Sequence, residues 1–218
     1  KHFGVTNKKN QRALIADILE AVNMRPEYMD RYPHEFSGGQ RQRIGIARAL
    51  LVHPEMVVCD EAVSALDVSI QAQVLNLLMQ LKEERHLTYI FITHNLGVVA
   101  EICDKVSVMY AGKIVEMASV KDLYGSPMHP YTWGLLDSMP SLSTERKTAL
   151  KTIAGTPPDL RLTGKCCNFY NRCPYAQTIC TECVPELKEL APGHLVACHR
   201  QNGVERLERE ERPRTHRA

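Results

Sequence analysis

Two glycines lie between a serine and a glutamine in the run Ser37, Gly38, Gly39 and Gln40. Glycines at the entry of a helix let backbone N–H groups approach an anion closely, and the helix dipole adds positive potential there. The run therefore predicts contact with a phosphate group. An ordinary serine N-cap followed by two flexible glycines would give the same letters, so these residues alone leave both interpretations open.

Acidic and imidazole side chains follow two apolar runs farther along the chain. Asp60 and Glu61 come directly after residues 56–59, and His94 comes after the β-branched and aromatic residues 88–93. If both runs are strands of one open α/β sheet, these polar groups lie together at its carboxyl edge, where such sheets bind ligands. Taken singly, an acidic pair after a strand is more often a helix start, and a lone histidine is more often structural.

Six of the eight cysteines crowd between Cys166 and Cys198. The chain shows no charged-then-apolar export pattern, so a disulfide framework is not expected. The clustering instead indicates metal ligation. Cys59 and Cys103 lie in apolar or helical contexts and are predicted to be small buried residues.

Hydrophobic periodicity predicts the elements that position these groups. Apolar residues at three- and four-residue intervals predict helices at residues 10–22, 37–51 and 69–84. Residues 56–59 predict a buried strand, residues 88–93 a second strand, and residues 105–118 a hairpin around Ala111 and Gly112. The fold class is therefore α/β.

Composition bounds the remaining possibilities. With 218 residues and 44% apolar content, the chain can form a sizeable core, and its net charge of +2 argues against a nucleic-acid partner. No apolar run approaches the roughly 18 residues that span a bilayer, so we expect a cytoplasmic location. The first residue is Lys1 rather than methionine, which suggests that the sequence opens inside a longer protein.

A change to Pro-rich and Cys-rich sequence after residue 125 predicts a domain boundary there. The expected organisation is an α/β domain at residues 1–125, a small Cys-rich module at residues 126–200, and a charged, disordered tail at residues 201–218.

The order of these motifs resembles the ATP-binding cassette (ABC) ATPase family, which has a P-loop NTPase-like nucleotide-binding domain. Ser37 to Gln40 looks like the signature motif, residues 56–60 like the Walker B strand, and residues 64–67 (Ser-Ala-Leu-Asp) like the D-loop. The resemblance implies that Asp60 ligates Mg²⁺, that Glu61 is the catalytic carboxylate, and that His94 senses the γ-phosphate of ATP. It also places Asp67 and the signature residues at the nucleotide. Asn95 is a departure, because relatives usually carry aspartate after the switch histidine.

Two further segments resemble the C-terminal extension of oligopeptide, dipeptide and nickel importer ATPases. They are His129-Pro130-Tyr131 and residues 155–160 (Gly-Thr-Pro-Pro-Asp-Leu). In that extension four cysteines hold a four-iron four-sulfur cluster, and the matching positions here are Cys167, Cys173, Cys180 and Cys198. A tetrahedral zinc site is the alternative, but the wide spacings are unlike the Cys-x2-Cys knuckles of zinc. Cys166 and Cys183 are extra and leave the ligand assignment open.

The resemblance also implies partner subunits, and it identifies a missing P-loop. No Gly-x-x-x-x-Gly-Lys-Ser/Thr P-loop occurs in the sequence, so the nucleotide-binding domain is expected to be incomplete. Family members sandwich two ATPs between two ATPase subunits, dock on membrane-spanning permease subunits at the cytoplasmic face of the membrane, and receive substrate from a binding protein. The expected function is ATP hydrolysis that drives peptide import. The alternative is a non-hydrolysing module that binds a metal cluster and docks to a partner subunit; an ABC ATPase of DNA repair or translation would carry long coiled coils or a duplicated cassette.

Overall fold

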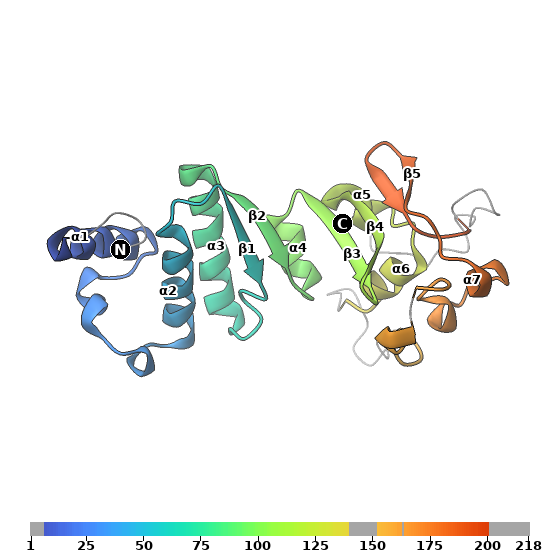
Figure 1. Ribbon diagram of the computed structural model, residues 1–218, viewed down its shortest axis with the longest axis horizontal. Coiled ribbons are helices and arrows are strands. Elements are labelled where there is room, and N and C mark those ends of the chain that lie inside the picture. The colour runs from blue at the N-terminus through green and yellow to red at the C-terminus, as the bar shows by residue number, and fades with distance from the viewer. Residues whose placement is uncertain (1–6, 140–151, 163, 201–218) are drawn as a thin grey trace. The chain divides into compact units, whose positions relative to one another are not determined.

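A computed structural model describes residues 7–139, 152–162 and 164–200 (Figure 1). The chain divides into two compact units, Lys1–Ile102 and Cys103–Ala218, which we describe separately. The charged segment 201–218, predicted to be disordered, lies outside the described residues. Among the helices of the described part, none has the length and apolar content needed to cross a bilayer.

The first unit alternates helices with two strands. Its elements are α1 (Lys8–Ala21), η1 (Pro26–Asp30), η2 (Pro33–Glu35), α2 (Gly38–Leu50), β1 (Met56–Asp60), α3 (Val68–Arg85), β2 (Thr88–Ile92) and α4 (Leu96–Ile102). The three helices and two strands predicted from periodicity are confirmed, with ends that agree within two residues. Helix α4 was not predicted, because its seven residues are too few to show a helical period.

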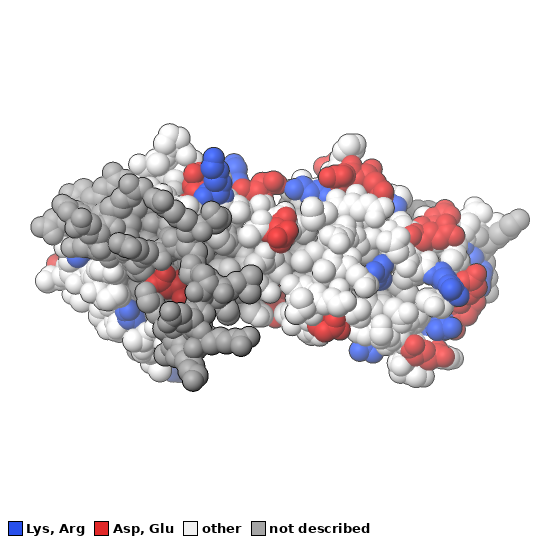
Figure 2. Space-filling view, turned by 180° about the vertical axis from the view of Figure 1, so that it is seen from behind, with Lys and Arg blue, Asp and Glu red and all other residues white. Residues whose placement is uncertain are grey.

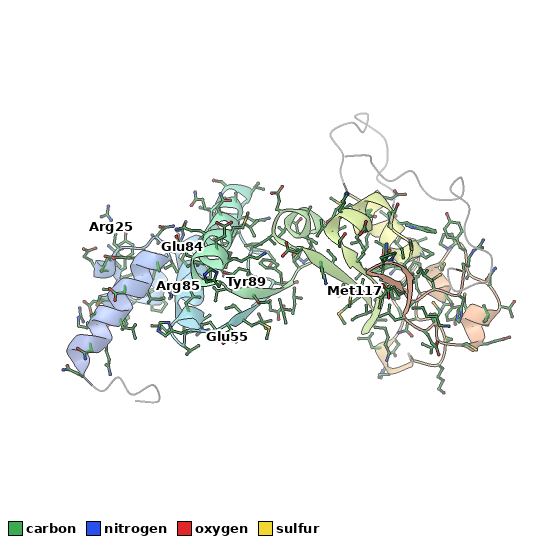
Figure 3. All side chains as sticks on the ribbon, turned by 90° about the horizontal axis from the view of Figure 1, so that it is seen from above. Arg25, Glu55, Glu84, Arg85, Tyr89 and Met117 are labelled. Carbon is green, nitrogen blue, oxygen red and sulfur yellow. The ribbon has the colours of Figure 1, made fainter. Side chains whose placement is uncertain are left out.

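Strands β1 and β2 pair in parallel, with Met56 opposite Thr88 and Asp60 opposite Ile92. Helix α3 packs against this pair with its leucine stripe, of which Leu77 and Leu81 belong to the buried core of the unit. Tyr89, labelled in Figure 3, reaches from β2 to this helix and donates its hydroxyl hydrogen to the carbonyl oxygen of Leu78 at 3.0 Å. Because the pairing is parallel, both strands end at the same edge of the sheet.

The second face of the β1–β2 pair is exposed. The prediction of a buried strand at residues 56–59 is confirmed for Cys59, which is 7% exposed, and is wrong for Met56 and Val58, which are 53% and 57% exposed. Ile90 and Ile92 on β2 share this face and are about half exposed. An apolar run typical of a doubly buried parallel strand therefore has only one covered face in the described residues.

The second unit is built on a four-stranded antiparallel sheet in the order β3-β4-β6-β5 (Figure 1). Its strands are β3 (Lys105–Tyr110), β4 (Lys113–Ser119), β5 (Lys188–Ala191) and β6 (His194–Val196). The predicted hairpin is confirmed, and both residues of its turn, Ala111 and Gly112, have positive φ angles of 47° and 76°. This is the backbone that a two-residue hairpin turn requires.

Helices and short turns surround this sheet: α5 (Val120–Gly125), α6 (Pro130–Asp137), η3 (Leu160–Leu162), η4 (Tyr170–Arg172) and α7 (Ile179–Glu182). The hairpin belongs to this unit rather than to the preceding one, because Glu116 and Met117 on β4 pair with Val196 and Leu195 on β6. The two compact units divide after Ile102, whereas the domain boundary predicted near residue 125 coincides with the end of α5 and stays a prediction.

Charged side chains of both signs are interspersed on the face that Figure 2 shows, and neither sign gathers into a continuous patch there. This distribution agrees with the small net charge of +2.

Candidate nucleotide site and cysteine cavity

The carboxyl ends of β1 and β2 bring Glu61 and His94 together. His94 Nδ1 lies 3.3 Å from Glu61 Oε1, and both side chains are more than half exposed. Asp60 ends β1 beside them, and among the described residues its carboxylate has no hydrogen-bond or ion-pair partner. The edge of the sheet thus presents two carboxylates and an imidazole to solvent, as the sequence predicts.

Glu61 has a left-handed backbone, with φ of +46°. Its N–H donates to the carbonyl oxygen of Ile92 at 2.9 Å, and its own carbonyl oxygen accepts the hydroxyl hydrogen of Ser64 at 3.0 Å. A non-glycine residue in this region is strained by roughly 1–3 kcal/mol, and such strain gathers at functional sites. The strained turn directs the Glu61 carboxylate toward His94. No sequence motif predicts this left-handed backbone.

The entry to α2 is a capping box. Ser37 Oγ accepts the N–H of Gln40 at 3.3 Å, and Gln40 Oε1 accepts the N–H of Ser37 at 3.0 Å. The structure therefore bears out the N-cap interpretation of Ser37 without excluding anion contact, because the remaining N–H groups at the start of the helix, including those of Gly38 and Gly39, still point outward from the first turn.

The two glycines of this entry have different surroundings. A Cβ atom on Gly39 would lie 2.4 Å from Cγ2 of Ile70, so this glycine lets α2 approach the first turn of α3. A Cβ atom on Gly38 would meet only Leu66 Cδ2, at an ordinary 3.6 Å. Close packing explains Gly39, and an open surface that an anion can reach remains at Gly38.

Residues 64–67 contact both the Glu61 region and the signature run at residues 37–40. Ser64 contacts Glu61, Leu66 packs next to Gly38, and Asp67 caps α3 by accepting the N–H of Ile70 at 2.9 Å. The structure thus gives Asp67 a capping role, and its contact with a nucleotide stays a prediction. Among the described residues, the signature run meets this loop and not Glu61 or His94 directly.

Beside the α2 entry lies a cavity of about 650 Å³ with a mixed polar and apolar lining, which sequence reasoning missed. Ser37 and Gln40 line it together with Arg43 and the amide side chains of α3. Arg43 donates to the carbonyl oxygen of Val22 at 3.0 Å and so ties α2 to the end of α1. Only the folded chain shows this cavity, because its walls come from three separate elements.

In the second unit, the cysteines chosen from the spacing pattern meet at one small cavity. Its lining includes Cys167, Cys173, Cys180 and Cys198. Cys166 and Cys183 do not line it. Burial raises the pKa of Cys167 to about 11 and that of Cys173 to about 12, so both thiols are protonated at neutral pH unless a metal displaces the proton.

The described cysteines do not surround a single point. No three histidine, cysteine or acidic side chains of the described residues lie close enough together to hold one metal ion. Four thiolates are the ligand set of both a tetrahedral zinc ion and a four-iron cluster, so the donor chemistry by itself admits either metal centre.

A buried carboxylate organises the chain next to this cavity. Glu116 is fully buried and accepts three hydrogen bonds: from His194 Nε2 at 2.7 Å, from the N–H of Met128 at 2.6 Å and from the N–H of His129 at 3.0 Å. His129 in turn caps α6, since its Nδ1 accepts the N–H of Tyr131 at 3.0 Å. Burial lowers the pKa of His129 to about 4, although nearby Glu116 opposes this effect, so the ring is neutral at pH 7.

The segment around residues 153–160 is held by Arg172, which was not singled out from the sequence. Its guanidinium donates to the carbonyl oxygens of Ile153 and Ala154, each at 3.0 Å. Ile153 packs against Gly134 of α6 so closely that a Cβ atom there would lie 2.6 Å from it. The glycine- and proline-rich motif is thus fastened to the unit that holds the cysteine cavity.

Comparisons with known proteins agree with this geometry. The family described as ABC transporter matches residues 2–64, and the family described as oligopeptide/dipeptide transporter, C-terminal region, matches residues 115–180. A solved structure, the ADP conformation of MJ1267, an ATP-binding cassette of an ABC transporter, superposes with a TM-score of 0.52 at 26% identity, covering 59% of this chain and 52% of that one. The chain is therefore similar to ABC transporter ATP-binding proteins over both matched segments.

The chain is also similar to proteins named for peptide transport. The oligopeptide transport ATP-binding protein AppF of Bacillus subtilis (strain 168) is 52% identical over 189 residues, which are 85% of this chain and 57% of AppF. A Brucella ovis protein named for peptide import and ATP binding is 49% identical over 199 residues, which are 91% of this chain and 63% of that protein. The chain thus spans about three fifths of the length of these relatives.

Proposed function

We propose that the protein is an ATP-hydrolysing subunit of an ABC importer that energises uptake of oligopeptides or dipeptides. The observation that carries the proposal is the contact between Glu61 and His94 at the carboxyl edge of a parallel strand pair. The similarity to peptide-import ATP-binding proteins over 85% of the chain supports the substrate class.

Each site residue has a role in phosphoryl transfer. Glu61 accepts a proton from the attacking water. At the same time the water oxygen bonds to the γ-phosphorus, and the bond between the γ-phosphorus and the oxygen that leaves with ADP breaks. His94 holds the Glu61 carboxylate in place through their 3.3 Å contact. Asp60, whose carboxylate is free among the described residues, would hold Mg²⁺ directly or through water. Mg²⁺ supplies charge neutralisation at the phosphate oxygens.

The signature run fits a second subunit's nucleotide better than its own. Gly38 is exposed at the α2 entry, next to Leu66 and away from Glu61 among the described contacts. We infer that Ser37 to Gln40 touch the ATP held by a partner ATPase, with permease subunits and a substrate-binding protein completing the importer. The subunit would then work at the cytoplasmic face of the membrane without crossing it.

The test compares two carboxylate-to-amide changes in cells that take up an oligopeptide through this importer. Glu61→Gln removes the proton acceptor, so uptake should fall by about 100-fold or more. Glu83→Gln, an exposed change on α3 outside the site, should leave uptake unchanged. Wild-type uptake in the Glu61→Gln cells, with the subunit present at the membrane, would overturn the proposal and favour a docking module that does not hydrolyse ATP.

For the second unit, we propose that Cys167, Cys173, Cys180 and Cys198 hold a four-iron four-sulfur cluster. All four line one cavity, and four thiolates are the ligand set of such a cluster. Chemical analysis of the purified chain for iron, acid-labile sulfide and zinc tests the assignment. Equal amounts of iron and sulfide, lost in Cys180→Ser and kept in Cys183→Ser, are expected; zinc in their place would refute it.

A further inference from the structure

His129 is a polar side chain with an unused donor beside the cysteine cavity. The residue is 2% exposed, and its ring lines the cavity that the four cysteines share. Among the described residues, Nδ1 of the ring has a hydrogen-bond partner in Tyr131, whereas no hydrogen bond joins Nε2 to an acceptor. The donor at Nε2 is therefore available to a group held in the cavity that His129 lines.

The proton of this ring is assigned by its other nitrogen. Nδ1 accepts the N–H of Tyr131 at 3.0 Å, so Nδ1 carries a lone pair and the single proton of the neutral ring is on Nε2. His129 therefore offers one donor, and the hydrogen bond at the start of α6 fixes the ring's orientation. Phe169 packs against the ring, with centroids 5.9 Å apart, and restricts its rotation further.

The backbone of His129 is equally constrained. Its N–H and that of Met128 both donate to Glu116, which is held from the opposite side by His194. These bonds join the loop before α6 to β4 and β6, and Cys198 lies two residues beyond the end of β6. One buried network thus positions both the histidine and one wall of the cavity.

We propose that Nε2–H of His129 donates a hydrogen bond to a sulfur atom of the group that the four cysteines hold. The inference rests on the proposed cluster. Hydrogen bonds to cluster sulfurs stabilise the added negative charge of the reduced form, so they raise the reduction potential. His129 then tunes the electron affinity of the cluster, and a residue that only capped α6 would have no such effect.

Two substitutions separate the donor from the cap. His129→Asn keeps an acceptor at the position of Nδ1 and loses the distal donor, whereas His129→Gln places an amide N–H near the position of Nε2. EPR-monitored redox titration of the reconstituted full chain should give a lower midpoint potential for His129→Asn and a value close to that of the wild type for His129→Gln. Circular dichroism and iron content confirm that each variant is folded and loaded.

Each other result has a defined meaning. Equal potentials in wild type and His129→Asn, or equal shifts in both variants, would overturn the hydrogen bond while leaving the cluster intact. A wild-type chain that binds no iron and sulfide would overturn the proposed cluster and this inference with it. Iron analysis precedes the titration, so the two failures are distinguished.

Discussion

The thiol of Cys59 lies one residue before Asp60, on the covered side of β1. Burial raises its pKa from 9.0 to about 11, and burial together with the neighbouring Cys59 raises that of Tyr89 to about 12. Both groups are uncharged at neutral pH, so the strand that carries the site carboxylates holds no competing negative charge on its inner face.

This burial predicts a loss of stability in alkali. An unfolded chain releases the Cys59 proton near pH 9, whereas the folded chain retains it up to about pH 11. The stabilisation is therefore complete below pH 9 and declines as the pH rises toward 11. Thermal unfolding midpoints of wild type and Cys59→Ala, measured across this range, should converge as the pH rises. A constant difference between them would show that the thiol is not protected.

Sequence predicted the chemistry of the site better than its geometry. Asp60, Glu61 and His94 follow recognisable apolar runs, so their place at one sheet edge could be inferred from strand order alone. The left-handed turn at Glu61 could not be inferred in this way, because it depends on a hydrogen bond to Ile92 of the neighbouring strand as well as on the local bond to Ser64. The sequence identified His129 only as part of the His129-Pro130-Tyr131 segment. The availability of its Nε2–H donor depends on the hydrogen bond of Nδ1 at the start of α6, which only the folded chain shows.

At the scale of elements, the approach of α2 to α3 depends on a missing side chain. Periodicity located both helices, but no local pattern could show that Gly39 faces Ile70. The departure at Asn95 is explained at this scale too: its Oδ1 accepts the N–H groups of Gly97 and Val98, a capping role that aspartate fills equally well.

The two glycines of the α2 entry make a matched pair of tests. Gly39→Ala places a methyl group 2.4 Å from Ile70 Cγ2 and should lower the free energy of unfolding by about 1–3 kcal/mol. Gly38→Ala meets only an ordinary contact and should be nearly neutral. Urea unfolding followed by circular dichroism measures both, and adding Ile70→Ala to Gly39→Ala should recover much of the loss. If the two alanine variants were equally stable, the close approach would be disproved.

At the scale of the whole molecule, the exposed sheet face dominates the expected solution behaviour. Met56, Val58, Ile90 and Ile92 form an apolar surface on the uncovered side of the β1–β2 pair. The sequence predicted burial for Met56 and Val58, because parallel strands usually have both faces covered. Apolar surface of this kind promotes association between molecules.

The chain on its own should therefore bind the apolar dye ANS and self-associate as its concentration rises. Replacing Val58 and Ile90 by threonine keeps β-branched side chains in the strands and adds polar groups to the exposed face. Dye fluorescence and the concentration dependence of the sedimentation coefficient should both decrease in this double variant. Unchanged values would mean that another surface drives the association.

The buried hydrogen bond between Glu116 and His194 bears on the order in which the second unit can form during synthesis. Glu116 leaves the ribosome 78 residues before His194, its imidazole partner. Burying the carboxylate earlier would leave it without one of its three hydrogen-bond donors, at a cost of about 1–3 kcal/mol. Closure of the core around Glu116 is therefore favoured only after β6 has been synthesised.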